Sequence, residues 1–189
     1  GTIGCYEKHM IERKLNGSDS YFENEILNEC KSYDNNEGKF QVDIEQYRKS
    51  YYESNFNNDS IKDICHAYLT GMQWVLSYYT STDTEWQWFY PYNYGPFAFD
   101  MTKHIGTYNF SHVNTGISND PFEQLLYILP PCSANLIPYP LDTLITSSES
   151  PLKKYYPTTF KVDNSGKKAV YESVVILPDI DTDEIHNMY

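Results

Sequence analysis

Apolar residues recur at helical spacing over residues 60–81, where the sequence reads SIKDICHAYLTGMQWVLSYYTS. Steps of three and four residues gather them on one side, which predicts a long helix with a wide, buried apolar face. Ser60 followed by Asp63 is a typical helix start. Gly71 costs a helix about 1 kcal/mol against alanine, so we expect it to admit a neighbouring backbone at close range. The apolar positions are Ile61, Ile64, Cys65, Tyr68, Met72, Val75, Leu76 and Tyr79.

In the rest of the first half of the chain, weaker helical patterns separated by polar segments predict further helices joined by loops. Asp43 followed three residues later by Gln46 is a helix-start signature. The predicted helices cover residues 5–16, 20–33 and a segment beginning after Asp43, and loops are predicted at 34–39 and 54–60.

The second half has clearer helix boundaries. Asp120 as N-cap, Pro121 at the first helical position and Glu123 two residues later predict a helix that Pro130 ends. One or two short helical turns are expected within 133–146. Further on, TFKVD and KKAVYESVVILP flank Ser165–Gly166, which predicts two strands around a turn, with VVILP buried on both faces.

These elements predict an α+β fold that is mostly helical, with a small β-sheet or hairpin near the C-terminus. A chain of 189 residues is long enough for one domain with a core and short for two, so residues 1–189 are expected to form a single unit. Hydrophobic residues make up 40% and aromatic residues 16%, with 19 tyrosines, so burial must rely on rings.

The formal net charge of -12 excludes some partners. Such a field repels phosphate at long range, which argues against a free-standing nucleic-acid-binding domain but allows an accessory part of a larger protein. No apolar run predicts a membrane span, and residues 1–15 lack the apolar region of a signal peptide. The four cysteines, at positions 5, 30, 65 and 132, form no CxxC pair, which favours reduced thiols in a cytoplasmic or nuclear protein.

No segment predicts catalysis or metal binding by this chain. DIDTDEIH at 179–186 resembles the start of a calcium loop, but Glu184 stands at the sixth position, where such a loop needs glycine. A solvated turn leading into a helix explains this segment better. The histidines are scattered, and no nucleophile or phosphate-binding motif is present.

The stretch WQWFYPYNYGPFAFD, residues 86–100, holds eight aromatic rings and a single charge. Pro91 and Pro96 exclude a regular helix or a central strand, and so many exposed rings would favour aggregation, so an ordered loop is predicted. Its rings could pack the loop onto the helix at 61–80. They could also form a platform that stacks on nucleobases, at roughly 1–3 kcal/mol per base, or on sugars. Both can hold, with some rings as anchors and one or two presented.

This stretch also carries a resemblance to a known family. GMQWVLSYYTSTDTEWQWFYPYNYGPFAFD resembles the second conserved region of the Xrn-type 5′→3′ exoribonucleases. PFEQLLYILPPCSANLIP and SESPLKKYYPTTFKVDNSGKKAVYESVVILPDIDTDEI resemble later family segments in the same order. The likeness spans about residues 47–186 and is weak over 1–40. The chain departs from the family pattern at Asn93 (histidine in the family), Gly95 (alanine), Phe99 (serine) and Tyr171 (tryptophan).

The resemblance implies a fragment of an enzyme that degrades single-stranded RNA with a 5′-monophosphate. The catalytic acids that hold Mg²⁺ would lie in an N-terminal half outside this chain, against which this segment packs and whose RNA entrance it helps to wall. The expected RNA-binding residues are Trp86, Trp88, Tyr92, Asn93 and Tyr94. The alternatives are an aromatic-rich module that binds peptides or sugars, and a non-catalytic scaffold.

Overall fold

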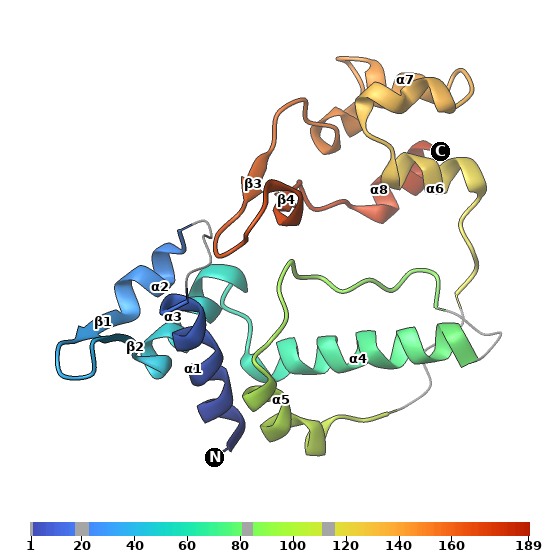
Figure 1. The fold of residues 1–189 in the computed structure, drawn as a ribbon. Helices are drawn as coiled ribbons and strands as arrows, with labels where there is room; N and C mark the ends of the chain where they lie inside the picture. The colour runs from blue at the N-terminus through green and yellow to red at the C-terminus, as the bar shows by residue number, and fades with distance from the viewer. Residues whose placement is uncertain (1, 18–22, 81–84, 111–115) are drawn as a thin grey trace. The chain divides into compact units, whose positions relative to one another are not determined.

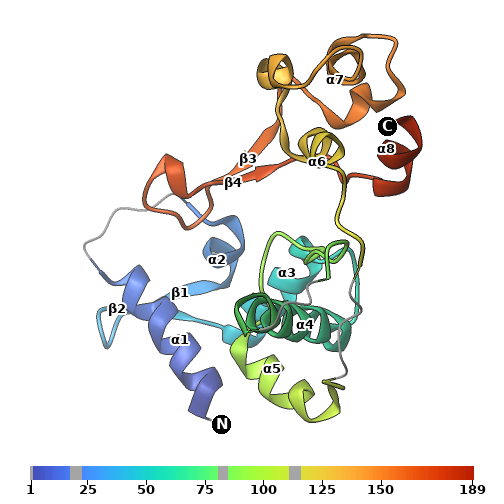
Figure 2. The same ribbon diagram turned by 90° about the vertical axis from the view of Figure 1, so that its right-hand side faces the viewer.

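The computed structural model describes residues 2–17, 23–80, 85–110 and 116–189. These form two compact units, one from residues 1–116 with 164–172 and the other from 117–163 with 173–189. Helices dominate both, and each of the two sheets found in the described residues is an antiparallel pair of strands (Figures 1 and 2). The predicted α+β, mostly helical class is therefore confirmed. Within these residues, no helix is long and apolar enough to cross a membrane.

The first unit contains five α-helices, one hairpin and two 3₁₀ turns among its described residues. Their bounds are α1 Thr2–Leu15, α2 Glu25–Cys30, β1 Lys31–Asp34, β2 Lys39–Val42, α3 Ile44–Asn55, α4 Ile61–Thr80, α5 Ala98–His104, η1 Ile105–Thr107 and η4 Val170–Glu172.

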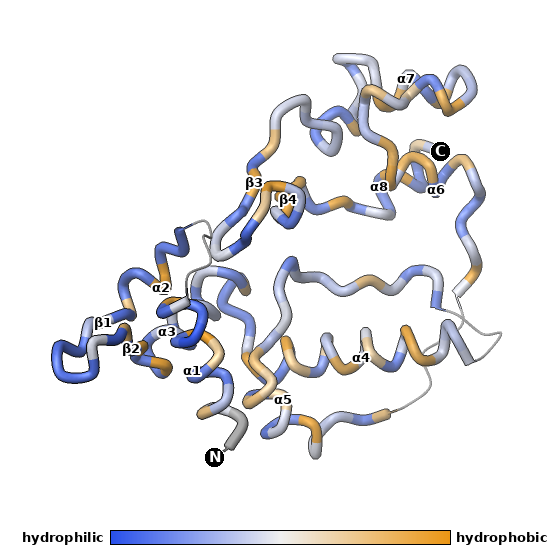
Figure 3. Tube along the Cα trace, in the orientation of Figure 1, coloured by the Kyte–Doolittle hydropathy of each residue, from blue (hydrophilic) through white to orange (hydrophobic). Residues whose placement is uncertain are grey.

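The predicted helix at 20–33 is wrong in its second part, and residues 18–22 lie outside the described residues. Asn24 caps α2 by accepting the Leu27 N–H at 2.9 Å, and the helix ends at Cys30. Lys31 then pairs with Val42 in an antiparallel hairpin. The polar segment predicted as a loop at 34–39 contains the turn of this hairpin, and Figure 3 shows that this turn is mostly hydrophilic. Cross-strand pairing overrides the local helical pattern here.

The starts of α3 and α4 follow the predicted signals. The Asp43 carboxylate accepts the N–H groups of Glu45 and Gln46, both at 3.1 Å. Ser60 Oγ accepts the Asp63 N–H at 3.1 Å. Each bond satisfies a backbone donor that the first helical turn leaves without a partner, so both predicted helix starts are confirmed.

The prediction that the whole apolar face of α4 is buried is wrong for its second half. Ile64 and Cys65 are fully buried, and Ile64 shares a core with Tyr52 of α3 and with Phe56, which follows that helix. Beyond Leu69 the apolar side chains emerge, and Leu76 is 63% exposed. The reason is that the α3 core meets only the first turns of α4. Other exposed positions of this half are Met72, Val75, Tyr78 and Tyr79.

The second unit is built from short helices around one core. The predicted helix start is confirmed, since Asp120 accepts the Phe122 N–H at 3.1 Å and Pro121 opens the helix. The predicted short turns within 133–146 are present. The elements are α6 Pro121–Ile128, η2 Pro131–Leu136, α7 Asp142–Thr146, η3 Pro151–Tyr155, β3 Lys161–Asp163, β4 Val174–Ile176 and α8 Thr182–Met188. The core comprises Leu126, Ala134, Ile137, Ile145, Leu152, Tyr156 and Ile185.

The predicted C-terminal strand pair is present, with two corrections. Lys161 pairs with Ile176 in an antiparallel hairpin, and Gly166 has a φ of 67°, as the turn prediction requires. The second strand begins only at Val174, because a 3₁₀ turn interrupts the connection. It is not buried on both faces, since Val175 is 45% exposed on an isolated two-stranded sheet.

The acidic segment at 179–186 leads into a helix, as predicted. Asp181 caps α8 by accepting the Glu184 N–H at 3.1 Å, so this aspartate serves the backbone.

Candidate functional site

The ring-rich segment is an ordered loop, as predicted. Residues 85–97 contain no helix or strand and run back along α4 before entering α5 (Figure 1). Side chains of α3 and α4 hold this segment, which we call the ring loop. An irregular segment needs such partners, because its backbone N–H and C=O groups lack the regular hydrogen bonds of a helix or sheet.

Helix α4 holds the first part of the ring loop. The Trp74 indole N–H donates to the Glu85 carbonyl at 2.7 Å. Trp88 lies over Gly71, where a Cβ would stand only 2.9 Å from the indole Cη2 atom. The close approach predicted at Gly71 is therefore made by a side chain, and the prediction of a neighbouring backbone is wrong. Glycine leaves room for the ring, which also lies 6.4 Å from the Trp74 ring between centroids.

Helix α3 holds the end of the ring loop. The Tyr51 hydroxyl donates to the Gly95 carbonyl at 2.8 Å. The Phe97 N–H donates to the Tyr52 hydroxyl oxygen at 3.0 Å. Burial raises the pKa of Tyr51 to about 12, so this phenol remains a neutral donor at physiological pH. Two tyrosines of one helix turn thus satisfy backbone groups that the loop cannot satisfy itself.

A buried ion pair fixes the point where the ring loop becomes α5. Asp100 is fully buried, and Arg48 donates from Nε and Nη2 to its two carboxylate oxygens, at 2.6 Å each. The Tyr52 hydroxyl donates to the same carboxylate at 3.0 Å, and Lys103 Nζ lies 3.6 Å away. Burial alone raises the pKa of Asp100, but hydrogen bonds from Arg48 and Tyr52 and the charges of Arg48 and Lys103 outweigh it, so the pKa is lowered.

The lowered pKa predicts how this ion pair responds to acid. The Asp100 pKa in the folded chain lies below its unfolded value of about 3.9. Its contribution to stability is therefore complete above about pH 4 and is lost as the pH falls through the folded pKa. The difference in free energy of unfolding between the wild type and Asp100→Asn, measured in denaturant at pH 7, 5 and 3, should be constant down to pH 5 and smaller at pH 3. An unchanged difference at pH 3 would contradict the assignment.

The two predicted tryptophans have different environments. The Trp86 side chain is 54% exposed, whereas Trp88 is half-buried against Gly71 and Trp74. Trp88 therefore has the packing role, and Trp86 presents a free part of its surface.

The other three predicted residues also differ in how exposed they are. Asn93 is exposed, while Tyr92 and Tyr94 are half-buried. The Tyr92 hydroxyl donates to Asp59 at 2.7 Å, and burial together with this bond raises its pKa to about 12. The Tyr94 ring lies 6.5 Å from that of Tyr51. Both tyrosines thus anchor the ring loop, and Asn93 stands between them on the outside.

A large apolar hollow lies between α4 and the ring loop. Its volume is about 650 Å³, and aromatic faces form most of its wall. Phe89, 63% exposed, and Met72, 57% exposed, leave the hollow accessible to another molecule or chain segment. It is lined by Tyr68, Gly71, Met72, Trp74, Val75, Trp88, Phe89 and Tyr90.

Comparison with known proteins decides the family. A sequence model described as the Xrn1 helical domain matches residues 6–188, nearly the whole chain. The chain belongs to the Xrn family of 5′–3′ exoribonucleases. The match includes most of residues 1–40, where the motifs gave little likeness.

Curated Xrn relatives agree with this assignment. Human 5′-3′ exoribonuclease 1 is 38% identical over 147 residues, which cover 75% of this chain and 8% of the human protein. Cryptococcus neoformans 5′-3′ exoribonuclease 2 is 38% identical over 144 residues, 74% of this chain and 13% of that protein. Schizosaccharomyces pombe 5′-3′ exoribonuclease 1 is 34% identical over 180 residues, 93% of this chain and 13% of that protein. The chain thus spans a small part of each relative.

The Xrn chain shows no metal centre in the part that the structure describes. No three His, Cys, Asp or Glu side chains come together there in a group that could hold a metal ion. The carboxylates that sequence analysis singled out at 179–186 begin a helix instead.

Sequence reasoning missed the residues of the Xrn chain that support the ring loop. Arg48, Tyr51 and Tyr52 were part of a predicted helix but received no role. Their spacing of three and four residues places them on one helix face, and this was the available signal. Their partners at Gly95 and Asp100 could not be inferred, because these contacts join positions 44 and 52 residues apart.

Proposed function

We propose that this chain is an accessory part of a 5′→3′ exoribonuclease that degrades single-stranded RNA with a 5′-monophosphate. The relatives are named 5′-3′ exoribonucleases, which supports RNA degradation as the reaction. The chain covers only a small share of each relative, which fits an accessory part of a larger enzyme. The catalytic acids and their Mg²⁺ would belong to the N-terminal half of the same polypeptide. The whole protein would act in the cytoplasm or the nucleus.

The observation that carries this proposal is the contrast between exposed Trp86 and the half-buried Trp88, Tyr92 and Tyr94. The ring loop is anchored by α3 and α4, yet Trp86 keeps 54% of its side chain exposed. An exposed indole on an anchored loop loses little freedom when a base stacks on it, which favours binding. Trp86 is therefore our choice for the ring presented to RNA, with exposed Asn93 as a second contact. Trp88, Tyr92 and Tyr94 would act indirectly, by holding the loop.

The exposed second half of α4 would pack against the catalytic half. Leu76 and Tyr79 are 63% and 79% exposed, beside exposed Met72 and Val75. A contiguous apolar surface of this kind is typical of a contact with another protein surface. The net charge of -12 fits this division of labour, because the phosphates would be attracted by another part of the enzyme.

The isolated 189-residue chain is expected to lack nuclease activity, because its described residues contain no metal-binding group. The test incubates the purified chain with 5′-monophosphorylated RNA and Mg²⁺ and follows the RNA length on a denaturing gel. A full-length Xrn enzyme that digests the same RNA provides the positive control. Digestion by the chain that EDTA abolishes would contradict the proposal.

A further inference from the structure

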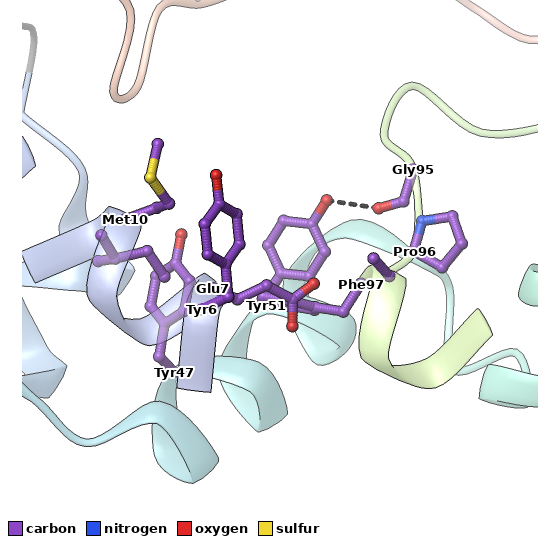
Figure 4. Close-up of a pocket in the computed structure, with 10 residues that line it drawn as sticks. Tyr6, Glu7, Met10, Tyr47, Tyr51, Gly95, Pro96 and Phe97 are labelled. Carbon is purple, nitrogen blue, oxygen red and sulfur yellow. Dashed lines mark hydrogen bonds between the residues drawn. The ribbon is translucent and has the colours of Figure 1, made fainter. Parts of the chain in front are cut away.

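A second hollow, separate from the α4 surface, lies in the first unit between α1, α3 and the end of the ring loop. Its volume is about 380 Å³, and it has no part in the function proposed above. Its wall is mostly aromatic and aliphatic (Figure 4). The lining residues are Tyr6, Glu7, Met10, Ile11, Tyr47, Tyr51, Gly95, Pro96, Phe97 and Ala98.

Three tyrosines from two helices form the main wall of this hollow. Tyr47 and Tyr51 are one turn apart on α3, with ring centroids separated by 6.3 Å, and Tyr6 of α1 lines the same hollow. Figure 4 shows their hydroxyls pointing to the same side. Tyr6 is 63% exposed, so its ring forms a raised edge rather than a lid. Open aromatic ridges of this kind suit an extended ligand that lies across them.

The polyproline II helix is the extended conformation that fits such a wall best. It has no internal hydrogen bonds, so its carbonyls are free to accept from tyrosine hydroxyls, and proline rings pack on aromatic faces. It is also stiff before binding, which lowers the entropy cost of association. The wall itself is held in place, since the Tyr51 hydroxyl is bonded to the Gly95 carbonyl.

Charge decides what else the ligand carries. Glu7 is the one charged residue among those that line the hollow, and its carboxylate makes a long contact of 3.4 Å with the Phe99 N–H. A carboxylate on an apolar wall favours a cation, and the chain's net charge of -12 attracts basic segments at long range. The same charges repel the phosphates of RNA.

We propose that this hollow docks a proline-containing segment of a partner protein in the polyproline II conformation, with an arginine or lysine directed to Glu7. Tyr6 would cover the proline face, and its hydroxyl would bond one of the segment's carbonyls. Such a contact would recruit a partner to a surface of the chain other than the one assigned to the catalytic half.

Selection from a displayed library of random twelve-residue peptides on the 189-residue chain tests this proposal. Peptides with a proline run and an arginine or lysine should be enriched, and fluorescence anisotropy should measure their Kd. Tyr6→Ala should weaken binding at least about tenfold, as loss of an aromatic anchor does. Glu7→Gln should weaken it about two- to fivefold, the effect of a partly exposed ion pair, and only for peptides that keep the basic residue.

Matched variants outside the hollow control for non-specific effects. Tyr171→Ala removes an 88% exposed tyrosine and Glu53→Gln an exposed carboxylate of α3, and neither should change the Kd. Unchanged near-ultraviolet circular dichroism of Tyr6→Ala would show that the fold is intact. The proposal is overturned if no selected peptide depends on Tyr6, or if the dependent peptides lack proline. It is also overturned if a twelve-nucleotide RNA displaces the Tyr6-dependent peptides from the chain.

Discussion

Asp100→Asn is expected to lower the free energy of unfolding by about 3 kcal/mol. The substitution keeps the shape of the side chain but removes the charge that accepts two 2.6 Å bonds from Arg48. Arg48 would then be left as a largely buried cation whose remaining carboxylate partner is the exposed Glu45, 3.6 Å away. The Arg48 side chain is 22% exposed, which favours the lower end of the range of about 3–5 kcal/mol for broken buried pairs. Urea denaturation at pH 7 measures the change.

Glu53→Gln provides the matched control for Asp100→Asn. It removes a carboxylate that lies 3.9 Å from Lys49 on the surface of α3, where both side chains are more than half exposed. An exposed pair of this kind contributes less than about 0.5 kcal/mol. If the two substitutions had equal effects, the anchoring role of Asp100 would be wrong.

Trp86→Ala in a full-length enzyme that contains this chain is expected to reduce kcat/KM on 5′-monophosphorylated RNA about 5- to 150-fold. This corresponds to the roughly 1–3 kcal/mol that stacking on one base contributes. The melting temperature should hardly change, because the side chain is 54% exposed. Single-turnover degradation of a labelled RNA, together with thermal unfolding of the same sample, checks both parts.

Trp88→Ala separates stacking from packing in the same loop. Because Trp88 is half-buried against Gly71 and Trp74, its truncation should lower the free energy of unfolding by about 2–3 kcal/mol, less than for a fully buried aromatic residue. Tyr33→Ala, an exposed ring of β1 outside the loop, should affect neither activity nor stability by much. A Trp86→Ala variant that unfolds like Trp88→Ala while keeping full activity would refute the stacking role.

Local signals in the sequence predicted the helices well and the strands less well. Asp43, Ser60 and Asp120 each begin a helix because capping depends only on residues within one turn. The hairpin of β1 and β2 was missed because apolar spacing before it suits a helix and strand pairing depends on residues further along. The burial of α4 was overestimated for a different reason. An apolar helix face indicates that another surface should pack on it. It does not show whether that surface belongs to this chain or to another part of the protein.

The candidate site shows the same limit at the level of side chains. Pro91 and Pro96 were sufficient to predict an irregular loop, and its ring content predicted order. Which rings are anchors could not be predicted, because Trp88 depends on the space above Gly71 and Tyr92 on a bond to Asp59. Asp100 is the only charged residue of the stretch, but the sequence did not show that it is buried. Its burial depends on the ion pair with Arg48, which lies 52 residues earlier.

The way the ring loop is held has a thermodynamic consequence. Aromatic side chains of α3 and α4 supply both the hydrogen bonds and the ring contacts that fix its conformation, so removing rings from water contributes to the free energy that orders it. Such burial carries a large heat-capacity change and weakens on cooling. The order of the loop, and with it the presentation of Trp86, would therefore weaken on cooling as the contribution of ring burial falls.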